Sequence, residues 1–192
     1  MHIIPENGDV GLYGADVPFL LFRPSLRNIA SLGTPVEIIA LFESVMGEST
    51  QLQMVDAMGV LWACCETPDA AHEAIGYLGE GDAVLGKMEP VHKIHIARHL
   101  MLHGMVGDVE ITPDNKTTGP IKEFKASNFA ALAIAHLGMS QADAWDMSMT
   151  ALITALNAKF PSVLNPEREG AKDAPTPDEH DATMAWFESI RG

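Results

Sequence analysis

The sequence holds four regularly spaced histidines whose chemistry could matter, in the segment VHKIHIARHLMLHG at 91–104. They are His92, His95, His99 and His103. Because an α-helix advances by about 100° per residue, this spacing places all of these imidazoles on one stripe of a helix. Neutral imidazoles at such a spacing can bind a metal ion. The stripe is therefore a candidate metal site.

The same helix also supports a structural interpretation. A metal ion needs several ligands that converge on one point, and a single straight helix presents only neighbouring side chains. Further ligands would have to come from His72, Glu73, His136 or another carboxylate. The rest of the helix is apolar nearly all round, which is typical of a helix at the centre of a fold. We therefore interpret the stripe as a packing seam of a binding protein, in which each imidazole is hydrogen-bonded. A metal-binding helical enzyme that uses the stripe is the alternative.

The sequence lacks other signatures of catalysis. It contains no His-Glu-x-x-His segment, no Gly-x-Ser-x-Gly elbow and no Gly-x-x-x-x-Gly-Lys phosphate loop. Cys64 and Cys65 are adjacent, so they cannot be expected to bridge each other, and their apolar helical context favours buried thiols in a reducing compartment. We expect no catalytic residues and no cofactor.

The amino-acid composition of the chain restricts the kinds of molecule that it can bind. The formal net charge of −14 over 192 residues disfavours binding to nucleic acid and to an anionic membrane surface. The N-terminus has no basic region followed by a long apolar one, and no apolar run reaches about 18 residues. The sequence therefore predicts a cytoplasmic protein. Its 11 methionines suit an irregular helical core and also an adaptable binding surface.

Helix start and stop signals recur from Pro24 onward. Thr34 is a predicted N-cap, with Pro35 at the first helical position and Glu37 completing a capping box. Similar signals, including caps at Ser140 and Ser148, predict an all-α, compact multi-helix domain over 24–161. A polar loop at 108–125 interrupts it, and the sequence leaves open whether that loop is ordered.

The two ends of the chain differ from this domain. Residues 1–23 form an arm or a short β-hairpin, with HII and PFLLF as its strands and ENGDVGLYGAD as the link. Residues 162–192 read as a flexible linker followed by a tethered amphipathic helix. Its apolar side chains are candidate contacts to a partner, unless the helix packs permanently on its own domain: Met184, Trp186, Phe187 and Ile190.

Three segments resemble a known class of proteins. They are AHLGMSQADAWDMSMTALITALNAKFP (135–161), RPSLRNIASLGTPVEIIALF (23–42) and IARHLMLHGMVG (96–107). All three are similar to segments of tail assembly chaperones of long-tailed bacteriophages and of related uncharacterised phage proteins. The resemblance covers residues 20–161, and its motifs are structural.

The resemblance implies a function without catalysis. Such chaperones are small helical proteins of the host cytoplasm that coat the tape-measure protein, recruit tail tube subunits and are absent from the finished virion. The implied partners are therefore the tape-measure protein and the tail tube protein, bound through apolar helical surfaces. A structural virion protein or a helical adaptor is the alternative. The sequence leaves open whether the chain forms a homo-oligomer and whether a frameshifted longer form exists.

Overall fold

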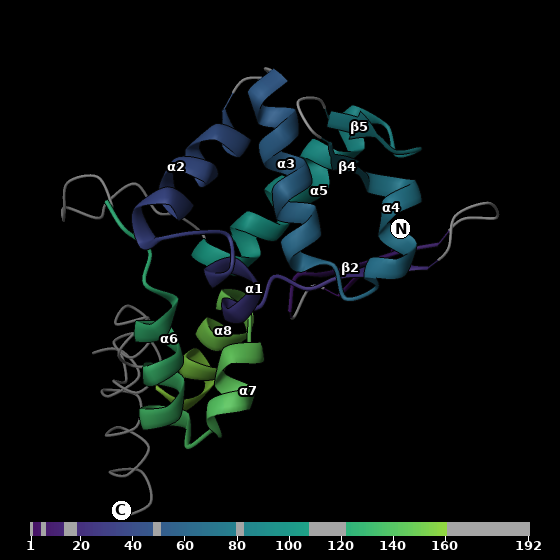
Figure 1. Ribbon diagram of the computed structural model, residues 1–192. Coiled ribbons are helices and arrows are strands. Elements are labelled where there is room, and N and C mark those ends of the chain that lie inside the picture. The colour runs from purple at the N-terminus through teal and green to yellow at the C-terminus, as the bar shows by residue number, and fades with distance from the viewer. Residues whose placement is uncertain are drawn as a thin grey trace, which may run out of the picture. The chain divides into compact units, whose positions relative to one another are not determined.

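The computed structural model describes residues 2–4, 7–13, 19–47, 51–79, 83–107 and 122–160. The chain divides into two compact units, Met1–Ala155 and Leu156–Gly192, and of the second unit only the residues up to Phe160 are described. The first unit is mostly helical with two small antiparallel sheets among its described residues (Figure 1). The linker and terminal helix predicted for 162–192, with Met184, Trp186, Phe187 and Ile190, lie outside the described residues. Most of the loop at 108–125 also lies outside the described residues.

The described helices agree closely with the helix start and stop signals in the sequence. The capping box is confirmed, since Thr34 N–H donates to Glu37 Oε2 at 2.7 Å. Ser140 and Ser148 also cap helices as predicted. The described helices are α1 (Leu26–Ala30), α2 (Pro35–Met46), α3 (Gln51–Cys64), α4 (Pro68–Ile75), α5 (Pro90–Met101), α6 (Ala126–Leu132), α7 (Gln141–Asp146) and α8 (Met149–Lys159), with π-helical turns η1 (Leu102–Val106) and η2 (Ala133–Leu137).

The N-terminal segment forms a sheet of three strands, β1 (His2–Ile4), β2 (Asp9–Leu12) and β3 (Leu20–Phe22). The segment HII forms β1, and the last three residues of PFLLF form β3. The predicted N-terminal β-hairpin is present, but the partner strands differ: β2 lies between β1 and β3 and pairs antiparallel with each. This strand was missed because its sequence, DVGL, is short, contains a glycine and stands in a Gly-rich stretch.

A second sheet corrects the all-α prediction. Strands β4 (Gly76–Leu78) and β5 (Ala83–Leu85) form an antiparallel pair where the sequence favours a helix running on to Gly79. Helix α4 ends at Ile75 because the next residue, Gly76, has a φ of 88°, a backbone angle that residues other than glycine rarely adopt. A Cβ at Gly76 would also collide with the carbonyl oxygen of Val84 across the pair.

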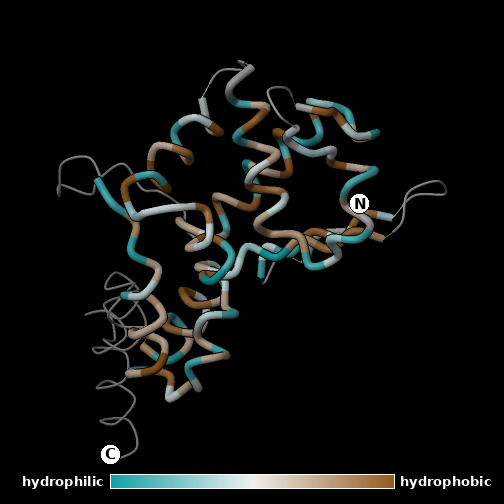
Figure 2. Tube along the Cα trace, viewed as in Figure 1, coloured by the Kyte–Doolittle hydropathy of each residue, from teal (hydrophilic) through white to brown (hydrophobic). Residues whose placement is uncertain are grey.

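The core of the first unit lies around α3 and α5, which make the most extensive contact among the described elements. Apolar positions recur along these helices and along β2 and β3 (Figure 2). The sheet is tied to α3 through backbone hydrogen bonds, from Arg23 N–H to Cys64 O and from Glu66 N–H to Leu21 O, each 2.8 Å long. Residues 1–23 thus belong to the same compact unit as the helices that follow. No described helix has the length and apolar composition needed to cross a bilayer.

Candidate functional site

Two histidines of the stripe join the helical core to other elements. His99 Nε2 lies 3.0 Å from the carbonyl oxygen of Gly8, which can only accept, so His99 donates this hydrogen bond. The rings of His99 and His103 lie 4.2 Å apart, and His103 Nδ1 is 2.7 Å from the Thr150 hydroxyl. Burial lowers the pKa of His99, which favours the neutral imidazole. For this pair, the predicted packing seam is confirmed.

The other two histidines of the stripe are not in the seam. His92 and His95 are exposed, and His92 lies 3.9 Å from Glu89. The prediction is wrong for them because the buried face of α5 runs through Lys93, Ile94, Ile96 and Ala97 in these first turns.

The further metal ligands considered from the sequence are engaged or exposed elsewhere. Glu73 pairs with Lys87, His72 makes edge contacts with two aromatic rings, and His136 is exposed. Within the described ranges, no three His, Cys, Asp or Glu side chains are grouped so that they could hold a metal ion. Cys64 is buried, and burial raises the pKa of its thiol, as for an unreactive core cysteine.

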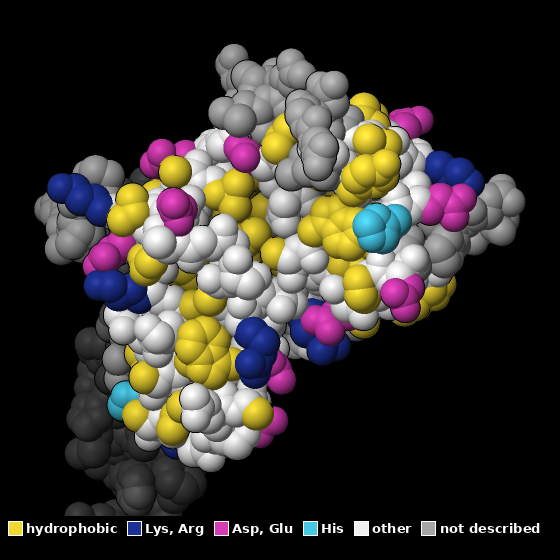
Figure 3. Space-filling model, viewed as in Figure 1, with side chains coloured by type: hydrophobic (Ala, Val, Ile, Leu, Met, Phe, Trp, Pro, Cys, Tyr) yellow, Lys and Arg dark blue, Asp and Glu magenta, His cyan; other side chains and the backbone are white. Residues whose placement is uncertain are grey.

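An exposed apolar surface covers the second sheet and its neighbours. Tyr77 and Val84 are opposite each other across β4 and β5, so their side chains share one face, and 47% and 43% of them are exposed. The Tyr77 ring lies 6.1 Å from His72, whose ring lies 4.8 Å from Trp62. We call these four residues the aromatic patch. Figure 3 shows hydrophobic side chains gathered beside a histidine in this region.

A hydrogen bond from Trp62 anchors the aromatic patch to the helical core. Trp62 comes from the buried helix α3, and its indole N–H donates to the carbonyl oxygen of Gly76 at 2.8 Å. This bond fixes the indole against the start of β4. Adjacent exposed aromatic and aliphatic groups on a rigid support are typical of a protein-binding surface.

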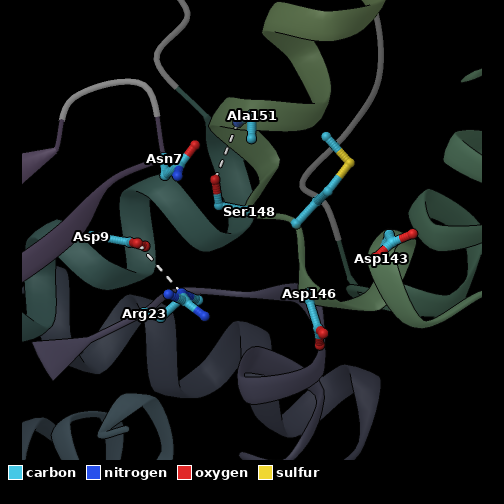
Figure 4. Close-up of a pocket in the computed structure, with 8 residues that line it drawn as sticks. Asn7, Asp9, Arg23, Asp143, Asp146, Ser148 and Ala151 are labelled. Carbon is cyan, nitrogen blue, oxygen red and sulfur yellow. Dashed lines mark hydrogen bonds and ion pairs between the residues drawn. The ribbon is translucent and has the colours of Figure 1, made fainter. Parts of the chain in front are cut away.

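A polar cavity of about 300 Å³ forms a second candidate site. We call it the Asp9 pocket. It is bounded by the start of β2, the end of β3 and the corner between α7 and α8 (Figure 4). Its described lining consists of Asn7, Asp9, Arg23, Asp143, Asp146, Met147, Ser148 and Ala151.

Asp9 is the most constrained residue of the pocket. Only 4% of it is exposed, and its Oδ2 accepts a hydrogen bond from Arg23 Nε at 3.4 Å. Its Oδ1 is buried and accepts no hydrogen bond from any residue that the structure describes. Burial raises the pKa of Asp9, and the Arg23 guanidinium lowers it in part. Figure 4 shows the carboxylate and Arg23 turned toward each other in the pocket.

The remaining polar groups of the pocket are engaged more fully. Asp146 pairs with Arg27 at 2.9 Å, and Asp143 accepts a hydrogen bond from Ser140. The Ser148 hydroxyl accepts from the Ala151 N–H as the cap of α8. Both aspartates of α7 are exposed, so Asp9 is the buried charge among the described lining residues.

Sequence reasoning missed the Asp9 pocket because it missed β2. The signal is the strand register: Val10 pairs with Phe22, so the preceding Asp9 and the following Arg23 must lie side by side. No sequence pattern joins this pair to α7, which lies more than a hundred residues further along the chain.

Together these features define a mostly helical domain that presents an exposed apolar surface at β4 and β5 and a polar pocket at Asp9. The chain belongs to a family of unknown function, DUF6246, whose model matches residues 47–182. No curated protein and no solved structure matches it. The family match includes the aromatic patch and α7, whereas Asp9 and Arg23 precede it.

Proposed function

We propose that this protein is a non-catalytic chaperone of phage tail assembly, which binds the tape-measure protein in the host cytoplasm. The tail-assembly assignment rests on the resemblance of residues 23–42, 96–107 and 135–161, because the family description names no activity. The observation that supports a binding role is the aromatic patch, an exposed apolar surface on a rigid support.

The aromatic patch suits the apolar face of an amphipathic helix. Complete burial of a fully exposed Val or Leu side chain is worth about 1.5–3 kcal/mol. Less than half of Tyr77 and of Val84 is exposed, so each adds only part of that energy, and a specific but reversible complex needs several such contacts. The protein's net charge of −14 would favour a partner with basic residues beside its apolar stripe. A tape-measure protein, as a long helical chain, could present such stripes repeatedly.

The proposal has a second part, which concerns the tail tube protein. Recruitment of tube subunits is assigned to further apolar helical surfaces. The candidate contacts in the C-terminal segment are Met184, Trp186, Phe187 and Ile190.

Co-expression with the tape-measure protein encoded in the same genome tests the first part. We expect several copies of this chain on one otherwise insoluble partner, measured as the mass of the complex by size exclusion with light scattering. The double variant Tyr77→Ser/Val84→Ser should lose most of the bound copies, because it removes the apolar face of β4 and β5.

The matched control is Val36→Ser on α2, which changes a side chain that is 62% exposed and outside the patch. It should bind as the unchanged protein does. If the tape-measure protein precipitates while this chain elutes free, the chaperone proposal is wrong. The presence of this chain in purified phage particles would favour the alternative that it is a structural virion protein.

A further inference from the structure

The Asp9 pocket contains an acceptor that the fold does not use. A buried carboxylate normally has each oxygen hydrogen-bonded, because an unsatisfied charged group is costly. Asp9 Oδ1 has no such partner among the described residues, while Oδ2 is held by Arg23. Asp9 therefore has an unused acceptor, and because this oxygen is itself buried, a donor in the pocket reaches it only when the side chain shifts toward the cavity.

The charges of the lining determine which kind of donor fits. Three aspartates line the pocket, and two of them are paired with arginines, Asp9 with Arg23 and Asp146 with Arg27. Asp143 accepts a hydrogen bond from Ser140, so the lining and its ion pairs hold one more carboxylate than guanidinium groups. An anion entering the pocket would meet this excess of carboxylates. A cation would be attracted by it and could offer N–H groups to Asp9.

The volume of the pocket and the apolar part of its wall further restrict the kind of cation that fits. A cavity of about 300 Å³ is at the small end of ligand sites and matches one long side chain or a small molecule. Met147 and Ala151 add apolar surface to the wall. A polar end that meets Asp9 and an apolar stem that meets these two residues would match the lining.

We propose that the Asp9 pocket binds an ammonium or guanidinium group carried on a short alkyl stem. The cation lies against the Asp9 carboxylate, and the stem lies along Met147 and Ala151. The same chemistry is supplied by a free alkyl amine or guanidine and by a lysine or arginine side chain of a protein. The proposal goes beyond the function proposed above and does not depend on it.

The test is a titration of the full ¹⁵N-labelled chain with propylguanidinium chloride and with butylammonium chloride, at constant ionic strength. We expect saturable shifts of the amide signals of Asn7, Asp9 and Ser148. Asp9→Asn should weaken binding at least about tenfold, because it replaces the free acceptor by an N–H donor and removes the charge.

Two further variants separate a built pocket from general attraction to an acidic surface. Ala151→Leu fills the cavity without changing any charge, and it should abolish saturable binding. Glu43→Gln removes one exposed charge on α2, away from the pocket, and it should leave binding unchanged. If Asp9→Asn does not fold, Ala151→Leu decides the question.

Capped tripeptides with a central arginine or lysine identify the source of the cation. Binding of a peptide about tenfold tighter than that of the free compound indicates a protein side chain, and equal or weaker peptide binding indicates a small molecule. Shifts that do not saturate, or that spread over the whole surface, would overturn the proposal. So would shifts in the Asp9→Asn and Ala151→Leu variants that are as large as those in the unchanged protein. The titration uses this chain alone, so its failure is separate from failure of the tape-measure experiment.

Discussion

Lys93 shows at the scale of one residue what a buried charge does to stability. Its side chain is fully buried in α5, and its Nζ has no hydrogen-bond partner in the described part of the chain. Burial lowers its pKa below the ordinary 10.5. The unfolded chain therefore binds this proton more readily than the folded chain does.

We expect Lys93→Met to raise the free energy of unfolding by about 1–3 kcal/mol at pH 7, because it removes an unsatisfied polar group and keeps the apolar stem. The gain should shrink as the pH rises toward 10.5, because there the amine becomes neutral in the unfolded chain too. Urea unfolding at pH 7 and pH 9 measures both effects. Lys122→Met, at an exposed position, is the control. A lower midpoint for Lys93→Met would show that the ammonium is stabilised in the fold.

The histidines and Asp9 show which properties of single residues can be predicted from the sequence and which cannot. The histidine spacing correctly predicts that His99 and His103 line a packing seam, because helical periodicity depends only on the local chain. It does not determine which turns of the helix other elements cover: Gly8 and Thr150 meet the stripe only at His99 and His103, and the earlier turns are exposed. Asp9 carries no local pattern, because its burial depends on a strand register and on α7.

At the scale of elements, Gly8 joins the N-terminal sheet to α5. It has a φ of 75°, and a Cβ there would overlap the Cβ of His103. Gly138, with a φ of 69° at the end of η2, has nothing within 4 Å of the same position. The two glycines therefore share the backbone requirement but differ in their surroundings.

We expect Gly138→Ala to cost about 1–2 kcal/mol of stability through backbone strain alone. Gly8→Ala should cost about 1–3 kcal/mol more, because it also forces His103 away from Thr150. Thermal unfolding followed by circular dichroism compares the two variants directly. Equal losses would mean that the sheet moves away from α5 without penalty.

Elements with strong local signals are the ones that the sequence predicts. The capping residues Thr34, Ser140 and Ser148 locate their helices because each cap acts within a few residues. All the described strands are three or four residues long, and the ones that the sequence does not predict are β2, β4 and β5. Both β2 and β4 contain a glycine, and β4 directly follows the signals for helix α4. They depend on pairing with another strand, which the local sequence does not encode.

At the scale of the whole chain, the dominant property is its net charge of −14. Mutual repulsion of these carboxylates opposes the compact state, and dissolved salt screens it over a Debye length of about 10 Å at 0.1 M. We expect the midpoint of thermal unfolding to rise by several degrees between 0.02 M and 0.5 M sodium chloride. Equal concentrations of sucrose are the control for effects unrelated to charge. A midpoint that falls with salt would mean that attractive ion pairs outweigh the repulsion.

The position of Trp62 gives the aromatic patch an optical reporter of its own. Its indole is partly exposed, is anchored to the Gly76 carbonyl and makes an edge contact with the ring of His72. A partner that covers the patch would displace water from this indole and shift its fluorescence to shorter wavelength. Once the other two tryptophans, Trp145 and Trp186, are replaced by phenylalanine, occupancy of the surface could be followed in solution without a label attached to this chain.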